Sequence, residues 1–196
     1  MFDAPAFDPG GPVLGVDPGL TRCGYGVVRR AGTGLVAVAF GAIGTDPDAP
    51  LPERLGTLEG EMCALFAEVM PSAVAVERLL FQHNVRTAIA VGQASGVVLA
   101  GAARAGVPVT HYSPNEVKLA VTGSGTADKT QVQAMVTRLL HLDAPPSPFD
   151  AADALALALC HAWGAPLRVA TAPAGTGPTS RLQHAVARAI AREEAS

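Results

Sequence analysis

The sequence predicts an α/β fold in which a mixed five-stranded sheet is flanked by helices on both sides. Three short apolar runs separated by glycine-containing turns open the chain, and they favour an antiparallel meander. Apolar strands then alternate with segments of helical periodicity, an order that is typical of parallel strands covered on both faces. The 196 residues are 49% hydrophobic, enough for one domain with a substantial core.

The first part of the chain is expected to form three antiparallel strands. The apolar runs cover residues 13–16, 25–29 and 35–43. The first run ends at Asp17, which begins the turn sequence Asp17-Pro18-Gly19. Because Asp is common in such turns for structural reasons, this residue on its own indicates only a turn.

Helical periodicity then alternates with short apolar strands. Leucine, methionine and phenylalanine recur at helical spacing over residues 51–70. A buried strand is expected at 73–76 with Glu77 at its end, followed by a helix at 84–105 and a strand at 107–110. Taken alone, Glu77 is also explained as an exposed strand end paired with a neighbouring arginine.

A stripe of small residues marks the helix expected at 84–105. Its members fall four residues apart and are Ala88, Gly92, Gly96 and Ala100. Small side chains let a second helix approach closely, so the stripe predicts tight packing either inside the fold or at a dimer interface.

Two shorter helices are expected next. Ser113-Pro114-Asn115-Glu116 is a capping sequence for a helix that carries Lys118. A further helix is expected at 128–141, with Lys129 in its first turn. A cation there opposes the helix dipole, and a bound phosphate would offset this cost.

The helix expected after Pro148 is central to the functional interpretation. Residues 154–160 are good helix formers with almost no polar side chain, so this helix belongs in the core. Asp150 and Asp153 lie at its start, about one turn apart on one face. They are explained either as a helix cap and a first-turn acid, or as two oxygen ligands for a metal ion.

Four acids are expected to meet at one edge of the sheet. If the strands that end at Asp17 and Glu77 are neighbours, the helix carrying Asp150 and Asp153 would have to begin at their carboxyl ends. Carboxylates gathered in one place repel strongly unless cations are bound. Two divalent cations, Mg²⁺ or Mn²⁺, would satisfy these acids and suit phosphodiester hydrolysis.

Composition argues against several other classes of protein. No apolar stretch is expected to be long and unbroken enough to span a bilayer, and the N-terminus lacks the pattern of a signal peptide. Cys23, Cys63 and Cys160 are odd in number and far apart, which argues against a disulfide framework and fits a reducing cytoplasm. With a net charge of −3, any nucleic-acid binding would need a local basic patch.

The chain is expected to divide into three segments. Residues 1–12 form an N-terminal extension, and residues 13–167 form the folded domain. Residues 168–196 turn to Ala, Pro, Gly and Thr, a composition that is typical of a linker or tail.

Five blocks of the sequence carry a resemblance to a known family. The blocks are Val13-Leu14-Gly15-Val16-Asp17-Pro18-Gly19 with Gly24-Tyr25-Gly26-Val27, Ala75-Val76-Glu77, Gly92-Gln93-Ala94-Ser95-Gly96, Gly123-Ser124-Gly125-Thr126-Ala127-Asp128-Lys129, and Asp150-Ala151-Ala152-Asp153-Ala154-Leu155-Ala156. They occur in the order found in RuvC Holliday junction resolvases, and the chain resembles that family from about residue 13 to residue 163. The resemblance implies a ribonuclease H-like fold, a homodimer, and Mg²⁺-dependent hydrolysis of four-way DNA junctions that leaves 5′-phosphates, in recombination and repair.

The resemblance also implies roles for individual residues. It assigns metal binding and catalysis to Asp17, Glu77, Asp150 and Asp153. The ions that these acids would hold are two Mg²⁺, for which Mn²⁺ could substitute. Lys118 and Lys129 correspond to the family's functional lysines, and Lys129 would stabilise charge on the scissile phosphate. The implied partners are four-way junction DNA, a second copy of the chain and the RuvA/RuvB branch-migration complex, with no membrane.

One block departs from the family pattern. Many relatives have a phenylalanine three residues after the glutamate, which is thought to stack on DNA bases, whereas this chain has Leu80 there and Phe81 next. Either Phe81 stacks or Leu80 acts as a wedge, although both are also explained as core residues. Arg78 beside them is a candidate for a DNA-binding groove and equally for ordinary surface.

Two other functions fit part of the pattern. An Asp-x-Gly turn followed by a glycine-rich hairpin also resembles the phosphate loop of actin-like ATPases and sugar kinases, although a phosphotransferase of that kind needs two such domains. The second alternative is a catalytically inactive junction-binding module, against which the complete set of four acids argues.

Overall fold

The computed structural model describes residues 10–78 and 85–171, with side chains through residue 164. The chain divides into two compact units, residues 1–165 and 166–196, and the first unit carries the sheet and the candidate site.

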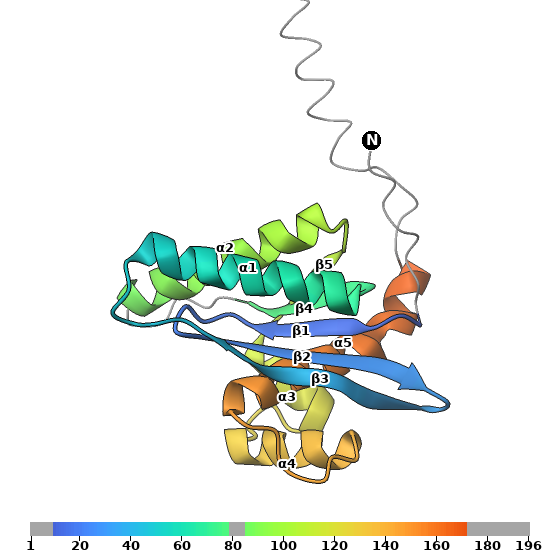
Figure 1. Cartoon of the computed structure of the whole chain (residues 1–196). Helices are drawn as coiled ribbons and strands as arrows, with labels where there is room; N and C mark the ends of the chain where they lie inside the picture. The colour runs from blue at the N-terminus through green and yellow to red at the C-terminus, as the bar shows by residue number, and fades with distance from the viewer. Residues whose placement is uncertain (1–9, 79–84, 172–196) are drawn as a thin grey trace, which may run out of the picture. The chain divides into compact units, whose positions relative to one another are not determined.

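A five-stranded mixed sheet forms the centre of the first unit (Figure 1). The strands lie in the order β3-β2-β1-β4-β5, with bounds β1 Val13–Asp17, β2 Arg22–Ala31, β3 Gly34–Gly44, β4 Ala73–Glu77 and β5 Val109–Tyr112. β1, β2 and β3 pair as an antiparallel meander, whereas β4 runs parallel to both β1 and β5. The predicted fold class and the parallel pairing of the fourth strand are confirmed.

The fifth strand begins later than the sequence predicted. The expected range was 107–110, but β5 starts at Val109. The Val107 amide donates instead to the carbonyl of Ala102 and closes the preceding helix, and Pro108 has no amide hydrogen to give to a ladder.

Helices cover both faces of the sheet, as predicted (Figure 1). One face carries α1 (Leu51–Val69) and α2 (Val85–Arg104), whose inner side chains form a core with β1 and β4. The other face carries α3 (Pro114–Thr122), α4 (Lys129–Leu139) and α5 (Phe149–Thr171) around a second core. The sheet therefore lies between two apolar layers, and its strand ends are left to carry polar groups.

Close packing of α5 on the sheet is made possible by two glycines. Gly15 of β1 and Gly26 of β2 are directly paired beneath the helix. A Cβ atom on Gly15 would overlap the Ala154 carbonyl oxygen, and one on Gly26 would lie 2.6 Å from the Leu155 backbone nitrogen. The helix backbone thus rests directly on the sheet, which fixes where its first turn lies.

The start and end of α5 both differ from expectation. The helix begins at Phe149, so Asp150 lies in the first turn and the alternative that it caps the helix is wrong. At the other end the helix continues to Thr171, past the composition change at residue 168.

The small-residue stripe of α2 faces outward. Gly96 and Ala100 are exposed, Ala88 and Gly92 are half-buried, and nothing lies within 4 Å of a Cβ built on Gly96. The inward packing is made elsewhere, because Gly101 gives room to the Phe66 ring of α1. The exposed half of the stripe, Gly96 and Ala100, is therefore free for the second predicted role, a dimer interface.

The expectation that no segment could span a bilayer needs correction. Among the residues that the structure describes, α2 alone is long and apolar enough to cross a membrane, because its alanines and glycines add no charge. By itself this is weak evidence for a membrane, since a helix that covers a sheet passes the same test.

Replacement of Gly26 by alanine tests the helix–sheet contact. We expect Gly26→Ala to lower the free energy of unfolding by about 1–3 kcal/mol, because the new methyl group forces the backbones apart. The measurement is urea-induced unfolding followed by circular dichroism. Gly60→Ala is the control: this exposed α1 glycine has free space around it, so alanine should add about 0.5–1 kcal/mol of stability. Equal effects at the two positions would contradict the packing argument.

Candidate active site

Two acids are brought together by strand register. Val16 of β1 pairs with Val76 of parallel β4, so Asp17 and Glu77 follow side by side at the same edge of the sheet. Side chains alternate along a strand, and Asp17 shares the face of Gly15, over which α5 packs. The two carboxyl groups are hydrogen-bonded to each other.

The start of α5 completes the acidic cluster. Gly24 lies opposite Asp17 in the ladder, and a Cβ on it would overlap the Asp150 carbonyl group. Asp153, one turn further along α5, lines a pocket of about 330 Å³ together with Asp17 and Glu77. Asp150 does not line this pocket, but its charge acts on Asp17. The structure therefore gathers the four predicted acids around one place.

Burial and mutual repulsion hold a proton in this cluster. Burial is the largest cause that raises the pKa of Asp17, to about 8, and the negative charges of Glu77, Asp153 and Asp150 raise it further. Burial also raises the pKa of Glu77, against which its hydrogen bond with Asp17 and the charges of Lys129 and Lys118 act. Near neutral pH the Asp17–Glu77 pair accordingly shares one proton.

Two lysines face the acids across the pocket. Lys118 of α3 and Lys129 of α4 both line it, and the Lys129 Nζ lies 3.0 Å from Asp153 Oδ2. The position of Lys129 follows from a capping box, in which the Asp128 side chain accepts the Gln131 amide and the Gln131 side chain accepts the Asp128 amide. The predicted first-turn location of Lys129 is confirmed.

The remaining acid is paired with an arginine. Arg22 Nε, at the first residue of β2, lies 3.1 Å from Asp150 Oδ2. Asp150 and Asp153 are thus each directed at a cation. Within residues 10–78 and 85–164, no three His, Cys, Asp or Glu side chains stand as a ready set of metal ligands. Metal binding by the four acids stays a prediction.

The expected DNA-stacking residues lie outside the described part of the chain. Leu80 and Phe81 fall in the gap between residues 78 and 85. Arg78 is described: it directly follows Glu77, its amide donates to the Tyr112 carbonyl, and its side chain is exposed. It follows a residue that lines the pocket but is not itself among the lining residues, and its role stays a prediction.

A family model agrees with this arrangement. The model described as crossover junction endodeoxyribonuclease RuvC matches residues 13–161. The chain belongs to the RuvC family. The match begins with β1 and ends within α5, so it covers all the elements that form the pocket.

Relatives and solved structures support the same family. Crossover junction endodeoxyribonuclease RuvC of Salinispora arenicola is 59% identical over 77% of this chain and 87% of its own length. The protein of that name from Streptomyces griseus is 54% identical over 89% of this chain and 81% of its own length. The structure of Thermus thermophilus RuvC in complex with a Holliday junction substrate superposes with a TM-score of 0.76 at 40% identity, covering 80% of this chain and 96% of that one.

A distant structure confirms the fold alone. The yeast mitochondrial Holliday junction resolvase Ydc2 superposes with a TM-score of 0.59 at 13% identity, covering 84% of this chain and 85% of that one. The ribonuclease H-like fold that the resemblance implied is therefore confirmed.

One residue that pairs with the acidic cluster of this RuvC chain, Arg22, was missed by sequence reasoning. The second strand was expected to start at Tyr25, which left Arg22 in a turn with no assigned direction. Once β2 is known to begin at Arg22, the two-residue alternation puts Arg22 on the face of Gly24, where α5 begins. The strand limit was the missing signal.

Removal of the Asp17 carboxyl group should stabilise the RuvC chain at alkaline pH in a metal chelator. The folded pKa of Asp17, about 8, exceeds its ordinary value of 3.8, so this group favours folding below pH 4 and loses that contribution as the pH rises through 8. We expect the free energy of unfolding of Asp17→Asn at pH 8 in EDTA to exceed that of the wild type by at least about 1 kcal/mol, and the difference to vanish near pH 4. Urea unfolding at a series of pH values measures this.

The control for this pH series is Asp143→Asn, which alters an exposed carboxylate that is not among the charges acting on Asp17. It should follow the wild-type profile. Parallel profiles for Asp17→Asn and the wild type would show that the Asp17 carboxyl group is not the source of the pH dependence.

Proposed function

We propose that this chain is a structure-selective endonuclease that resolves four-way DNA junctions by metal-dependent phosphodiester hydrolysis, leaving 5′-phosphates, in recombination and repair. The observation that carries the proposal is the pocket in which Asp17, Glu77 and Asp153 face Lys118 and Lys129, in a member of the RuvC family. Carboxylates suit a divalent metal, and lysines suit a phosphate.

The residues present fit a divalent cation. Asp17, Glu77, Asp150 and Asp153 offer hard oxygen ligands, and the pKa of Asp17 is raised by burial and by the negative charge of its neighbours, which a cation would offset. We expect these four acids to hold two Mg²⁺ ions, with Mn²⁺ as a substitute. When bound, the metal supplies a Lewis acid that activates water and neutralises charge on a phosphate.

The basic side chains of the chain would bind the DNA phosphate rather than the metal. Lys129 Nζ now bonds Asp153, and its side chain is 68% exposed, so it can reach an anion at the mouth of the pocket. Lys118 lines the same wall. Together with Arg78 they form the local basic patch that a chain of net charge −3 needs for DNA. Base stacking by Phe81, or wedging by Leu80, is part of this proposal.

The alternatives gain no comparable support. The family match and the relatives favour the nuclease and not a phosphotransferase fragment of the actin-like or sugar-kinase type. An inactive junction-binding module would not need a buried cluster of acids whose mutual repulsion costs stability.

A nicking assay on a synthetic four-way junction tests the proposed activity. We expect the wild type to cut the junction with Mg²⁺ or Mn²⁺ and to leave a linear duplex of the same sequence intact. Asp17→Asn and Asp153→Asn should each abolish cutting and keep junction binding, because they remove metal ligands and no phosphate contact. Asp143→Asn, an exposed acid, should cut normally. Full nicking by Asp17→Asn would overturn the assignment.

The exposed face of α2 supports the expected homodimer. Val85 and Ile89 are 72% and 57% exposed, and they continue the outward stripe of Gly96 and Ala100. An apolar helix face with small residues at four-residue spacing suits a second copy of the same helix. Two pockets related by a two-fold axis would let two strands of the junction be cut symmetrically. Delivery by the RuvA/RuvB complex and a cytoplasmic location, in keeping with three free cysteines, complete the proposal.

A charge on this face should separate the two copies. We expect Ile89→Asp to shift the protein from dimer to monomer at micromolar concentration, because the aspartate would be buried without a partner in the interface. Sedimentation velocity measures the change. Val38→Asp is the matched control, since Val38 is 52% exposed on β3, and it should stay dimeric. A wild type that sediments as a monomer would contradict the dimer outright.

A further inference from the structure

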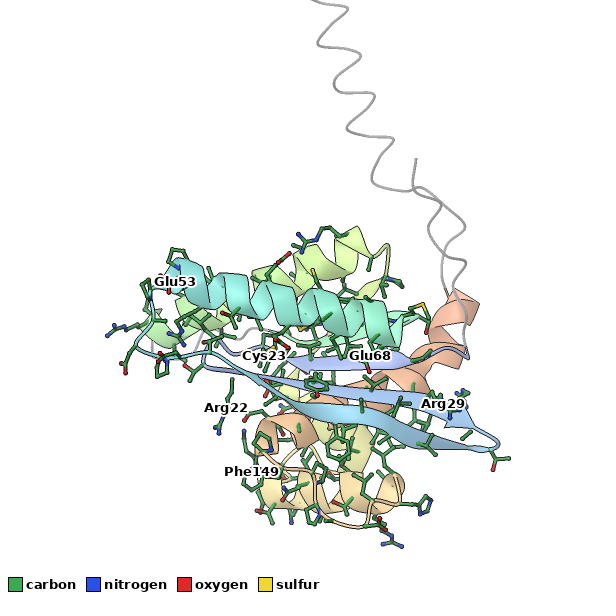
Figure 2. All side chains as sticks on the ribbon, viewed as in Figure 1. Arg22, Cys23, Arg29, Glu53, Glu68 and Phe149 are labelled. Carbon is green, nitrogen blue, oxygen red and sulfur yellow. The ribbon has the colours of Figure 1, made fainter. Side chains whose placement is uncertain are left out.

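Arg22 joins the acidic cluster from a direction that the lysines do not cover. It is the first residue of β2, and its Nε lies 3.1 Å from Asp150 Oδ2. Figure 2 shows Arg22 near the start of α5, marked by Phe149, and Arg29 at the opposite end of the same strand. Arg22 therefore lies beside the candidate site, whereas Arg29 lies well away from it.

Most of the guanidinium group remains available to another anion. The Arg22 side chain is 62% exposed, while that of Asp150 is 24% exposed. The ion pair engages Nε, and a guanidinium has four further N–H donors in a fork that matches phosphate oxygens. An ion pair of this exposure is weak, so exchange of one anion for another costs little.

A second arginine binds the residue that precedes Arg22. Arg54 of α1 donates to the Thr21 hydroxyl at 2.9 Å and to the Thr45 hydroxyl at 3.0 Å. These bonds tie the turn before β2 to the start of α1. Arg22 thus reaches the acids from β2, whereas Lys118 and Lys129 line the pocket from α3 and α4.

Asp150 has two competing uses in this arrangement. Its Oδ2 accepts from Arg22, and the same carboxylate belongs to the set expected to hold a divalent cation. One carboxylate oxygen beside a cation binds a second cation less tightly, because the first neutralises part of its charge. Arg22 and a divalent ion therefore oppose each other at Asp150.

We propose that Arg22 is a phosphate-binding residue that exchanges between Asp150 and the DNA backbone, and that it thereby couples metal binding to junction binding. This inference rests on the proposed function and adds one residue to its site. A phosphate that takes the guanidinium frees Asp150 for the metal, and a metal that takes Asp150 frees Arg22 for a phosphate. By linkage the two effects are equal in size.

The test measures binding rather than cutting. We expect Arg22→Gln to weaken junction binding in EDTA and to reduce the slope of log affinity against log salt by about 1, because one phosphate contact is lost. Without DNA, the same variant should bind Mn²⁺ about two- to fivefold more tightly by isothermal titration calorimetry, because a competing cation is gone. Arg22→Lys keeps the charge and should retain the wild-type salt slope.

Arg29→Gln is the matched control, with the same charge change on the same strand, and it should leave Mn²⁺ affinity unchanged. Thermal melting in EDTA verifies that each variant is folded. The inference is overturned if Arg22→Gln matches Arg29→Gln in salt slope, or if its Mn²⁺ affinity is unchanged or lower. A wild type that binds the junction but never cuts it would instead overturn the proposed function, so the two failures are distinguishable.

Discussion

The direct contact between the α5 backbone and a glycine-lined strip of the sheet is the constraint on which the rest of this structure depends. Gly15, Gly24 and Gly26 supply no side chains, so the helix rests on β1 and β2 without a spacer. An alanine at these positions would lift the helix by roughly the size of a methyl group. The first turn of α5, with Asp150 and Asp153, would then no longer meet the ends of β1 and β4.

This contact concentrates like charges in a site where water is partly excluded, at a cost in stability. Two unit charges 4 Å apart interact by about 4 kcal/mol at an effective dielectric of 20, so unbalanced carboxylates would oppose folding. The structure limits this cost with a proton shared by Asp17 and Glu77, and with ion pairs from Lys129 and Arg22. The fold is thus held at the site by groups that the proposed reaction would have to displace.

Much of the fold could be predicted because its signals are local. The meander, the alternation of helix and strand, and the capping boxes at Ser113 and Asp128 each depend on a few adjacent residues. The convergence of Asp17 and Glu77 was also predictable, since neighbouring parallel strands end at a common edge. Asp150 was harder to assign: it would cap a helix that began at residue 151, but the helix already begins at Phe149.

The remaining features depend on distances that a sequence does not encode locally. Whether the α2 stripe faces α1 or solvent depends on which side of α2 the Phe66 ring of α1 contacts. The ring packs against Gly101 and not against Gly96. Arg22 was missed because strand limits in a glycine-rich hairpin are weakly specified, and a shift of three residues decides whether a side chain belongs to a turn or to a face of the sheet.

The balance of charge in the pocket bears on the order of binding. Four carboxyl groups with a shared proton face Lys118, Lys129 and Arg22, so the site is close to neutral as it stands. A phosphate entering it alone would add negative charge beside acids, and a divalent cation entering alone would displace the chain's own cations. When both bind, the charge of each ligand offsets the unfavourable charge that the other brings into the site. A site built in this way favours joint occupation over either ligand singly, which would tie metal loading to the presence of DNA.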